Sequence, residues 1–410
     1  MNNIKRIKMA CYSMNVSMAV VGNLPPLLFI TFHNAYGISY SLLGLLVLIN
    51  FSTQLAVDLI FTLYSHKFNI HKTVKITPVL TMLGLLVFTL WPTLLPSSAY
   101  VGFVIGTVIF SSSAGLAEVL LNPVIAALPS DNTERDLSML HSSYAWGAVG
   151  VVIVGALSIL MLGSDNWQWL VLLMACLPLL SFFLYFGAEL PEIATGSSDK
   201  SAASVFKNGQ LWLCALAIFL GGALECTMAQ WCSGFAEIAL GVPKIFGDIF
   251  GVALFSVMLG TGRTLYTKYG KHIERVLLLG VAACLVCYLV AALSGNAVIG
   301  LLACALTGLS ASMLWPGSII TVSERIPTGG VIMYALMAAG GDLGASVGPE
   351  LVGVITDAIA SSTDMAILAD RFGLTPEQLG MKCGLLVGAV FAAIAIPVYI
   401  RIFKTGGKVR

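Results

Sequence analysis

Charged residues are scarce in this sequence. Only 10% of its 410 residues are Asp, Glu, Lys or Arg, whereas 58% are hydrophobic. Soluble domains carry about 25% charged residues, so the composition excludes an ordinary soluble domain. The formal net charge is +1 at pH 7, and without a basic excess there is no electrostatic reason to expect binding to nucleic acid.

Sequence motifs of catalysis and cofactor binding are also missing. The chain has no phosphate-binding glycine-rich loop, no nucleophile triad and no cluster of metal ligands. Its nine cysteines lie mostly within apolar runs, and the Cys284–Cys287 pair has no second pair with which to hold a metal. We therefore predict no enzyme, no catalytic residue, no metal site and no cofactor. The missing nucleotide-binding domain also argues against an ATP-driven pump.

Apolar runs of about 20 residues recur along the whole chain, and each is long enough to cross the hydrocarbon core of a bilayer. They predict an all-α integral membrane protein with twelve transmembrane helices in two six-helix halves. The predicted spans cover residues 9–32, 40–64, 73–94, 99–128, 138–162, 168–187, 210–238, 246–267, 275–293, 297–322, 331–358 and 380–403.

The distribution of Lys and Arg predicts the orientation of these spans. Most basic residues fall in the two terminal segments and in the loops on the same side, which places both termini in the cytoplasm. We expect the protein in the plasma (cytoplasmic) membrane, which is the inner membrane of a cell that has two membranes. The polar segment 191–209 is predicted as a central cytoplasmic loop between an N-terminal half, residues 1–190, and a C-terminal half, residues 210–410.

The two halves also echo each other in sequence. Lys67, just after the second span, recurs as Lys268 after the eighth span. The triplet Leu-Asn-Pro at 121–123 recurs as Leu-Trp-Pro at 314–316. Because both halves have the same topology, the echoes predict a parallel repeat about an axis along the membrane normal.

The fourth span carries polar residues where a purely structural membrane helix would carry leucine. Glu118 and Asn122 are four residues apart and project from one face, and Pro123 leaves the carbonyl of Val119 without its helical partner. An acid at this depth costs about 2.5–3.5 kcal/mol on insertion scales. We therefore expect Glu118 to face a polar path and bind a proton, and Asn122 to bind substrate or orient the acid. The alternative is a structural acid between helices.

The second span carries a polar stripe formed by Asn50, Gln54 and Asp58, each four residues from the next. The two amides are predicted to bind substrate or, alternatively, to make hydrogen bonds between helices. Asp58 is a candidate for proton coupling or gating. At the start of the fifth span, His141 and Tyr144 share a face and are candidate substrate ligands. The alternative there is an aromatic cluster at the membrane surface.

The seventh span offers Glu225, Gln230 and Trp231. Glu225 is a candidate for proton coupling, whereas an amide and an indole suit the hydroxyl groups and the C–H face of a polyol. The alternative pairs Glu225 with a neighbour and packs Trp231 against lipid. Glu237, near the end of this span, is expected to be solvated.

Three further features complete the candidate set. In the eleventh span, Asp342 is a candidate for proton coupling, and Tyr334, eight residues earlier on nearly the same face, is a candidate substrate ligand. Arg263 in the eighth span is expected to extend its side chain toward the aqueous surface. Thr375 and Gln378 predict the capped start of a short helix outside the membrane.

Six plus six spans, internal termini and the basic loop His-Lys-Phe-Asn-Ile-His-Lys after span two together resemble the major facilitator superfamily. Within it, GLAEVLLNP of the fourth span, GGALECTMAQWCSGFAE of the seventh and GGDLGASVGPELVGVITD of the eleventh are similar to the fucose/galactose:proton symporter branch. Glu118 stands at the position of that branch's acid. The acid that fucose symporters carry in span one has no counterpart in GNLPPLLFITFH.

The resemblance implies a secondary transporter that moves a small polar organic solute, with a sugar favoured, by alternating access and proton-coupled symport. Its implied partners are the substrate, protons and the lipid bilayer, its energy source is the proton gradient, and we expect a monomer. The alternatives are a drug or metabolite exporter of the same superfamily and a membrane nutrient sensor that transports nothing.

Overall fold

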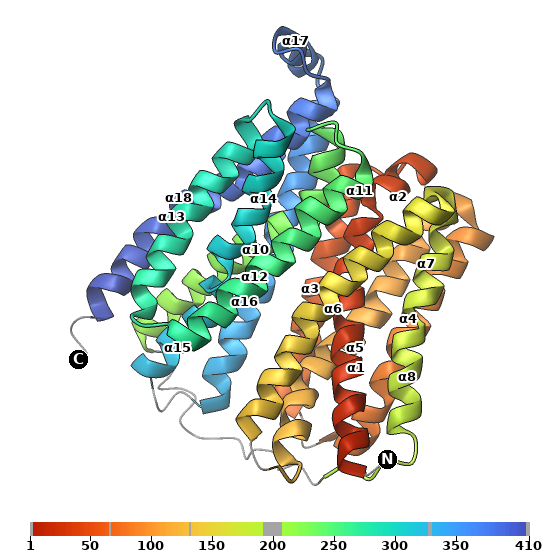
Figure 1. Cartoon of the computed structure of the whole chain (residues 1–410), viewed down its shortest axis with the longest axis vertical. Helices are drawn as coiled ribbons and strands as arrows, with labels where there is room; N and C mark the ends of the chain where they lie inside the picture. The colour runs from red at the N-terminus through yellow and green to blue at the C-terminus, as the bar shows by residue number, and fades with distance from the viewer. Residues whose placement is uncertain (1–2, 65–66, 131–132, 192–206, 327–329, 407–410) are drawn as a thin grey trace. The chain divides into compact units, whose positions relative to one another are not determined.

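The computed structural model describes residues 3–64, 67–130, 133–191, 207–326 and 330–406, and within these ranges every regular element is a helix (Figure 1). Eleven helices are long and apolar enough to cross a membrane, and the count becomes twelve if one bent pair of helices forms a single span. The predicted all-α membrane fold with a helix at each predicted span is therefore confirmed.

The chain divides into two compact units, Met1–Gly37 with Ile49–Ser198, and Ile38–Leu48 with Asp199–Arg410. Of the predicted central loop 191–209, residues 192–206 lie outside the described part of the chain. The helices of the first unit are α1 (Asn3–Leu27), α2 (Phe29–Tyr36), α3 (Tyr40–Tyr64), α4 (Ile70–Leu94), α5 (Ala99–Ala127), α6 (Thr133–Leu162), α7 (Trp167–Met174) and α8 (Cys176–Tyr185), with short 3-10 turns at Pro96–Ser98 and Ser164–Asn166.

The second unit holds the remaining helices, and one span in it contains a π-helical stretch. Its elements are α10 (Gly209–Ile238), α11 (Lys244–Phe246), the π-helix η4 (Gly247–Ala253), α12 (Leu254–Tyr269), α13 (Ile273–Leu293), α14 (Ala297–Ala311), α15 (Leu314–Arg325), α16 (Gly330–Ala360), α17 (Thr363–Arg371) and α18 (Pro376–Gly406).

Helix α3 contributes to both units, because its first turns pack with α16 of the second unit. The carboxylate of Asp357 accepts the backbone N–H groups of Tyr40 (3.0 Å) and Ser41 (2.6 Å). These N–H groups belong to the first turn of α3 and have no partner within the helix. The backbones of α3 and α16 also approach closely, since a Cβ at Gly353 would lie 2.3 Å from the carbonyl oxygen of Tyr40. The boundary that the sequence predicted at residue 190 does not assign Ile38–Leu48 to the second unit.

The first span is broken rather than continuous. Helices α1 and α2 meet at an angle of 47°, directly after Pro25 and Pro26. Neither proline has an amide hydrogen, so the carbonyls of Val21 and Gly22 lose their usual helical partners and the helix bends.

Helices α10 and α16 make a close contact along a seam of glycines. A Cβ added at Gly344 would lie 1.9 Å from the carbonyl oxygen of Phe219, and one at Gly222 would lie 2.4 Å from that of Gly341. Small residues at such seams let two helix backbones approach and gain van der Waals contact, which drives helix association in lipid. The glycines of the eleventh span therefore allow a close approach of α16 to α10.

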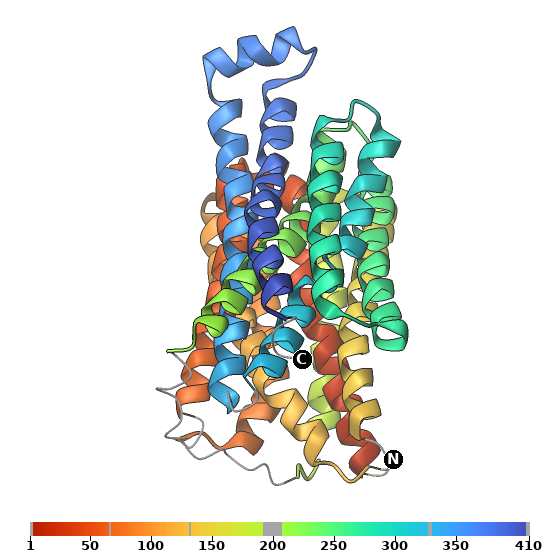
Figure 2. The same cartoon turned by 90° about the vertical axis from the view of Figure 1, so that its left-hand side faces the viewer.

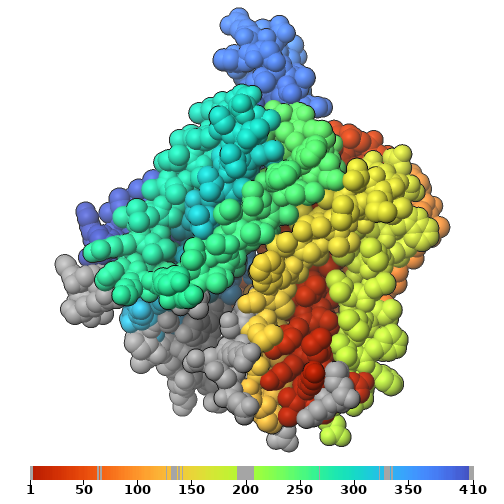
Figure 3. Space-filling model, in the orientation of Figure 1, coloured from red at the N-terminus to blue at the C-terminus, as the bar shows by residue number. Residues whose placement is uncertain are grey.

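The outer surface of the second unit carries large apolar side chains. Helix α13, teal in Figure 3, exposes Leu279, Val286 and Leu293 with exposed fractions of 71%, 59% and 70%. The three residues are seven apart and therefore lie on one face of the helix. A soluble protein would not expose such a stripe to water, whereas a bilayer accommodates it.

The predicted helix cap at Thr375 is confirmed, but it begins a different helix from the one expected. Gln378 Oε1 accepts the amide of Thr375 at 3.0 Å, and Thr375 Oγ1 accepts the amide of Gln378 at 3.2 Å, which is a reciprocal capping box. The helix that starts here is the long α18. The short helix is α17, which lies between α16 and α18 at one end of the unit (Figure 2).

The glycine seam generates a stability prediction. We expect Gly344→Ala to lower the free energy of unfolding by about 1–3 kcal/mol, because the new methyl group forces apart two backbones that cannot yield locally. Thermal unfolding of the detergent-purified protein measures the effect. Gly260→Ala in α12 is the matched control, since a Cβ there meets nothing within 4 Å. Equal unfolding temperatures for the two variants would show that the α10–α16 contact is looser than described.

Candidate functional site

The polar stripe of α3 packs against α5 within the first unit. Asn50, Gln54 and Asp58 are all buried. Asn50 Oδ1 accepts the hydroxyl of Ser111 at 2.5 Å and the side-chain amide of Gln54 at 3.0 Å. The contact with Ser111 is the interhelical hydrogen bond that was one of the two interpretations of this stripe. A role for Asn50 and Gln54 in substrate binding stays a prediction.

Asp58 and Glu118 are brought together at the C-terminal end of this stripe. The side-chain carboxylates of the two residues are electrostatic neighbours. Their helices come close because α5 has a glycine at this level: a Cβ at Gly115 would lie 3.0 Å from both Asp58 Oδ1 and the carbonyl oxygen of Gln54. Asp58 Oδ1 is buried and accepts no hydrogen bond. Two carboxyl groups thus share one place without a basic partner among the ion pairs of the described residues.

Glu118 and Asn122 lie on one face of α5, as predicted. The Asn122 side chain donates to the Glu118 carbonyl at 3.4 Å, and its own Oδ1 is buried without a donor. Although many protein atoms surround Glu118, its side chain is exposed. An acid in the middle of a 29-residue apolar helix is far more costly against lipid than against water, so we take this exposure to mark a wet face.

Three aromatic or imidazole candidates lie on α6 and α16. His141 lies in α6 and Tyr334 in α16, but the side chains of both fall outside the described part of the chain. Tyr144 is half-exposed, and its hydroxyl lies against α1, where a Cβ at Gly22 would be 3.2 Å from it. The structure therefore leaves the predicted roles of His141, Tyr144 and Tyr334 as predictions.

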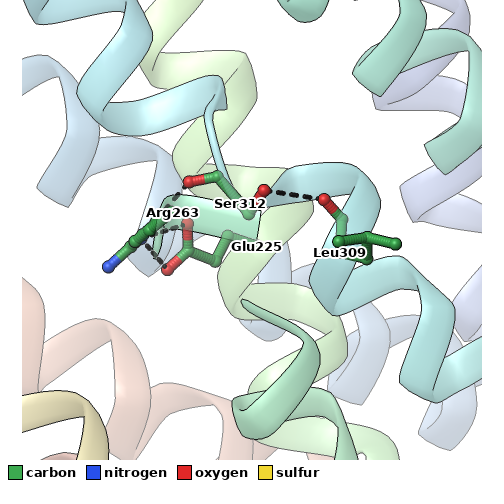
Figure 4. Close-up of polar contacts among 4 residues, drawn as sticks. All are labelled: Glu225, Arg263, Leu309 and Ser312. Carbon is green, nitrogen blue, oxygen red and sulfur yellow. Dashed lines mark hydrogen bonds and ion pairs between the residues drawn. The ribbon is translucent and has the colours of Figure 1, made fainter. Parts of the chain in front are cut away.

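Glu225 forms an ion pair with Arg263 in the second unit, in which one guanidinium nitrogen contacts both carboxylate oxygens (Figure 4). Arg263 Nη2 lies 2.9 Å from Glu225 Oε1 and 3.0 Å from Oε2, and Arg263 Nε donates to the carbonyl of Ser312 at 3.1 Å. The expectation that Arg263 extends to the aqueous surface is wrong. Pairing with an acid in the same bundle offsets the cost of the charge better than reaching for the interface.

The carbonyl of Ser312 is available because of a proline one turn later. Pro316 has no amide hydrogen, so the oxygen four residues earlier lacks its helical partner. The hydroxyl of Ser312 turns back to the carbonyl of Leu309 at 2.7 Å (Figure 4). The Leu-Trp-Pro triplet at 314–316 was therefore the sequence signal that could have located the arginine site. It was recognised only as a repeat.

Asp342 lies near this ion pair. It is 4% exposed on α16, and together with Glu225 and Arg263 it is an electrostatic neighbour of Cys226. The structure thus gathers two acids and one guanidinium between α10, α12 and α16. The cluster carries one more negative than positive charge when both acids are ionised.

Trp231 and Gln230 are buried on α10. The indole N–H of Trp231 donates to the carbonyl of Pro349 at 2.8 Å, and its ring meets that of Tyr40 edge-on at a centroid distance of 6.4 Å. The alternative that placed Trp231 against lipid is therefore wrong. A sugar could stack on this fully buried ring only after these contacts open.

Metal binding finds no support in the described ranges, where no three His, Cys, Asp or Glu residues come together as a possible ligand set. The chemistry that the two clusters can perform is the binding and release of protons and the hydrogen bonding of polar groups.

Sequence and structure comparisons agree on the type of protein. The profile of the Major Facilitator Superfamily matches residues 10–349. An uncharacterized MFS-type transporter of Bacillus subtilis (strain 168), YttB, is 22% identical over 370 residues, which cover 86% of this chain and 89% of the relative.

Solved transporters share the fold at low sequence identity. A D-xylose-proton symporter matches with a TM-score of 0.76 and 16% identity, over 97% of this chain and 99% of its own. A bacterial homolog of the human lysosomal transporter Spinster matches with a TM-score of 0.75 and 12% identity, over 99% and 97%. The Escherichia coli fucose:proton symporter, to which the sequence motifs are similar, matches with a TM-score of 0.58 and 16% identity, over 96% and 99%.

The profile match covers most of the chain, and the matching folds are those of transporters. The expectations of a transporter fold and of a protein that is not an enzyme are thereby confirmed. This chain belongs to the Major Facilitator Superfamily of membrane transporters.

Proposed function

We propose that the protein is a proton-coupled symporter of a small polar organic solute, with a sugar favoured, and that it works by alternating access. The observation that carries the coupling is the pair of acids Asp58 and Glu118 on α3 and α5. Two like charges in one poorly solvated place disfavour double ionisation, so such a pair retains and exchanges a proton.

The other acids are less suited to carry the proton. Both oxygens of Glu225 are engaged by one nitrogen of Arg263, so a proton binding there must first break a charge-assisted ion pair. Asp342 lies beside that same pair. None of the ion pairs among the described residues joins Asp58 or Glu118 to a guanidinium or ammonium group, so a proton that binds there displaces no such cation. We therefore assign the coupling proton to Asp58 and Glu118, and a fixed positioning role to Glu225.

Several amides support a polar, hydroxyl-rich substrate. Asn50, Gln54, Asn122 and Gln230 are amide side chains in the membrane spans, and amides both donate to and accept from hydroxyl groups. Two solved transporters with a similar fold, the xylose and fucose symporters, favour a sugar. An exporter of drugs or metabolites is the second candidate, because the Spinster homolog has the same fold. A sensor would bind ligand without transporting it.

We expect a protein that works alone in the membrane and is driven by the proton gradient. The protein would act as a monomer in the cytoplasmic membrane, with both termini in the cytoplasm. The positive charges of the terminal segments and of the loops on the same side favour this orientation. It would need no cofactor, since the proton gradient would supply the energy.

The acid pair generates the central prediction. We expect Glu118→Gln to abolish accumulation of sugar driven by a pH gradient, because an amide cannot release a proton, while sugar exchange at equal pH persists. Proteoliposomes tested with radiolabelled xylose and fucose, with a pH-sensitive dye for proton entry, measure both activities. Asp58→Asn is expected to weaken gradient-driven uptake in the same assay.

Glu189→Gln is the matched control, since Glu189 is an exposed acid outside the candidate spans. Gradient-driven accumulation that survives Glu118→Gln unchanged would refute the coupling role. If the wild type transports neither sugar, thermal stabilisation by a panel of sugars, nucleosides, amino acids and cationic drugs identifies the substrate class, and stabilisation by drugs alone would favour the exporter.

The ion pair of the second unit generates a separate prediction. Glu225→Gln and Arg263→Met are each expected to reduce the free energy of unfolding by about 1–3 kcal/mol, because each leaves one charge without its partner. This is less than for a fully enclosed pair, since the Arg263 side chain is 37% exposed. The double variant should lose less than the sum of the two. Thermal unfolding of all four proteins gives the coupling energy, and strict additivity would contradict the ion pair.

A further inference from the structure

A second group of charged residues lies near the C-terminal end of α10, apart from the ion pair of Glu225. Ser233 and Glu237 are four residues apart on α10 and share a face, whereas Lys244 begins α11 and Asp248 lies in the π-helix η4. We call Ser233, Glu237, Lys244 and Asp248 the Asp248 cluster. None of its residues belongs to the candidate set that the sequence predicted for binding or coupling.

Two glycines of the π-helix bring this cluster together. A Cβ at Gly247 would lie 2.8 Å from the Cβ of Ala236, and one at Gly251 would lie 2.7 Å from Cys232 Sγ. The backbone of η4 therefore rests directly on α10, and Asp248 is held against Ser233. π-Helical stretches inside membrane or soluble helices are rare and are found disproportionately at functional sites.

Asp248 is fully buried, yet only one of its two carboxylate oxygens is satisfied. Oδ1 accepts the Ser233 hydroxyl and lies 3.3 Å from Lys244 Nζ, which also donates to Ser233 Oγ at 3.2 Å. The side chain of Asp248 is 0% exposed and that of Lys244 is 14% exposed. Oδ2 has no hydrogen-bond partner. A buried carboxylate oxygen without a donor is costly, and its retention points to a ligand that supplies the missing hydrogen.

Glu237 supplies a second such oxygen. It is an electrostatic neighbour of both Lys244 and Asp248, and its Oε2 is buried without a partner. The residue is partly exposed, as expected near the end of the span, but this oxygen is not in contact with solvent. The cluster holds two carboxyl groups and one ammonium group, so one negative charge remains uncompensated when all three are ionised.

The neighbouring elements add no second basic group. Helix α14, which also packs on η4, contributes Cys304 and no charged residue. Helix α12 contributes Arg263, which is held by Glu225. The first turn of α3 contributes Tyr40, whose electrostatic neighbours are Glu237, Asp357 and Glu377. None of these neighbouring elements therefore compensates the excess negative charge of the cluster.

We propose that the Asp248 cluster is a proton-binding site in which Glu237 and Asp248 together hold one proton. A proton neutralises the single excess charge and makes one carboxyl group a hydrogen-bond donor, as the two orphaned oxygens require. A metal cation fits poorly, because the ammonium group of Lys244 lies 3.3 Å from the oxygen that it would need and would repel it. The site is independent of the pair Asp58 and Glu118.

Infrared difference spectroscopy of the purified protein between high and low pH tests the proposal. A protonated carboxyl group gives a C=O stretching band that a carboxylate lacks. In an Asp58→Asn/Glu118→Gln background, we expect this band to persist and to lose about one carboxyl equivalent in either Glu237→Gln or Asp248→Asn. Glu237→Gln is the safer variant for folding, because Glu237 is only partly buried and makes no hydrogen bond to Ser233 or Lys244 in the structure.

Lys244→Met provides a readout that a merely structural role would not move. Without the ammonium group, the two acids should keep their proton to higher pH, so the midpoint of the band's disappearance should rise by about one pH unit or more. Glu189→Gln is the control and should leave the midpoint in place. An unchanged band in a folded Glu237→Gln variant, or an unchanged midpoint in Lys244→Met, would overturn the proposal. The measurement needs no transported substrate, so its failure leaves the proposed symport intact, and the reverse also holds.

Discussion

The cost of an unpaired charge or carbonyl in an apolar surrounding governs how the polar residues of this protein are placed. Pro316 frees the carbonyl of Ser312, and Arg263 takes it with Nε while giving its terminal nitrogen to Glu225. Each of these groups would be expensive alone, and together they form a satisfied network. The network requires α10, α12 and the break between α14 and α15 to meet at one point. It therefore fixes the packing of the second unit as much as its apolar contacts do.

Much of the fold could be predicted because it depends on local pattern. The length of apolar runs identified the spans, and the structure has helices at each of them. The reciprocal pattern of Thr375 and Gln378 predicted a helix start. These features involve neighbours in sequence or the composition of a single helix, so periodicity and spacing are sufficient to find them.

The features that sequence reasoning missed depend on contacts between distant residues. Asp357 caps the first turn of α3 although more than three hundred residues separate them, and no spacing rule connects the two. Arg263 was placed at the surface because its position near a helix end was visible, whereas its partner Glu225 on another helix was not. Lys244 and Asp248 were missed because nothing in their own stretch of sequence shows that they are buried. Their burial follows from Gly247 and Gly251, whose effect appears only when η4 meets α10.

The two halves use the same proline motif with different electrostatic results. Pro123 and Pro316 stand in matching triplets, and each frees a carbonyl one turn earlier. In the second half, α12 supplies Arg263 to a neighbouring acid, and the charge of that acid is compensated. In the first half, α3 has no basic residue anywhere between Tyr40 and Tyr64, and it supplies Asp58 instead. A site whose acid faces a permanent cation resists a change of protonation, whereas a site with two acids favours it. Divergence of one repeat from the other thus gives a physical basis for a fixed ion pair at Arg263 in the second half and for the proposed coupling proton at the corresponding helix, α3, in the first half.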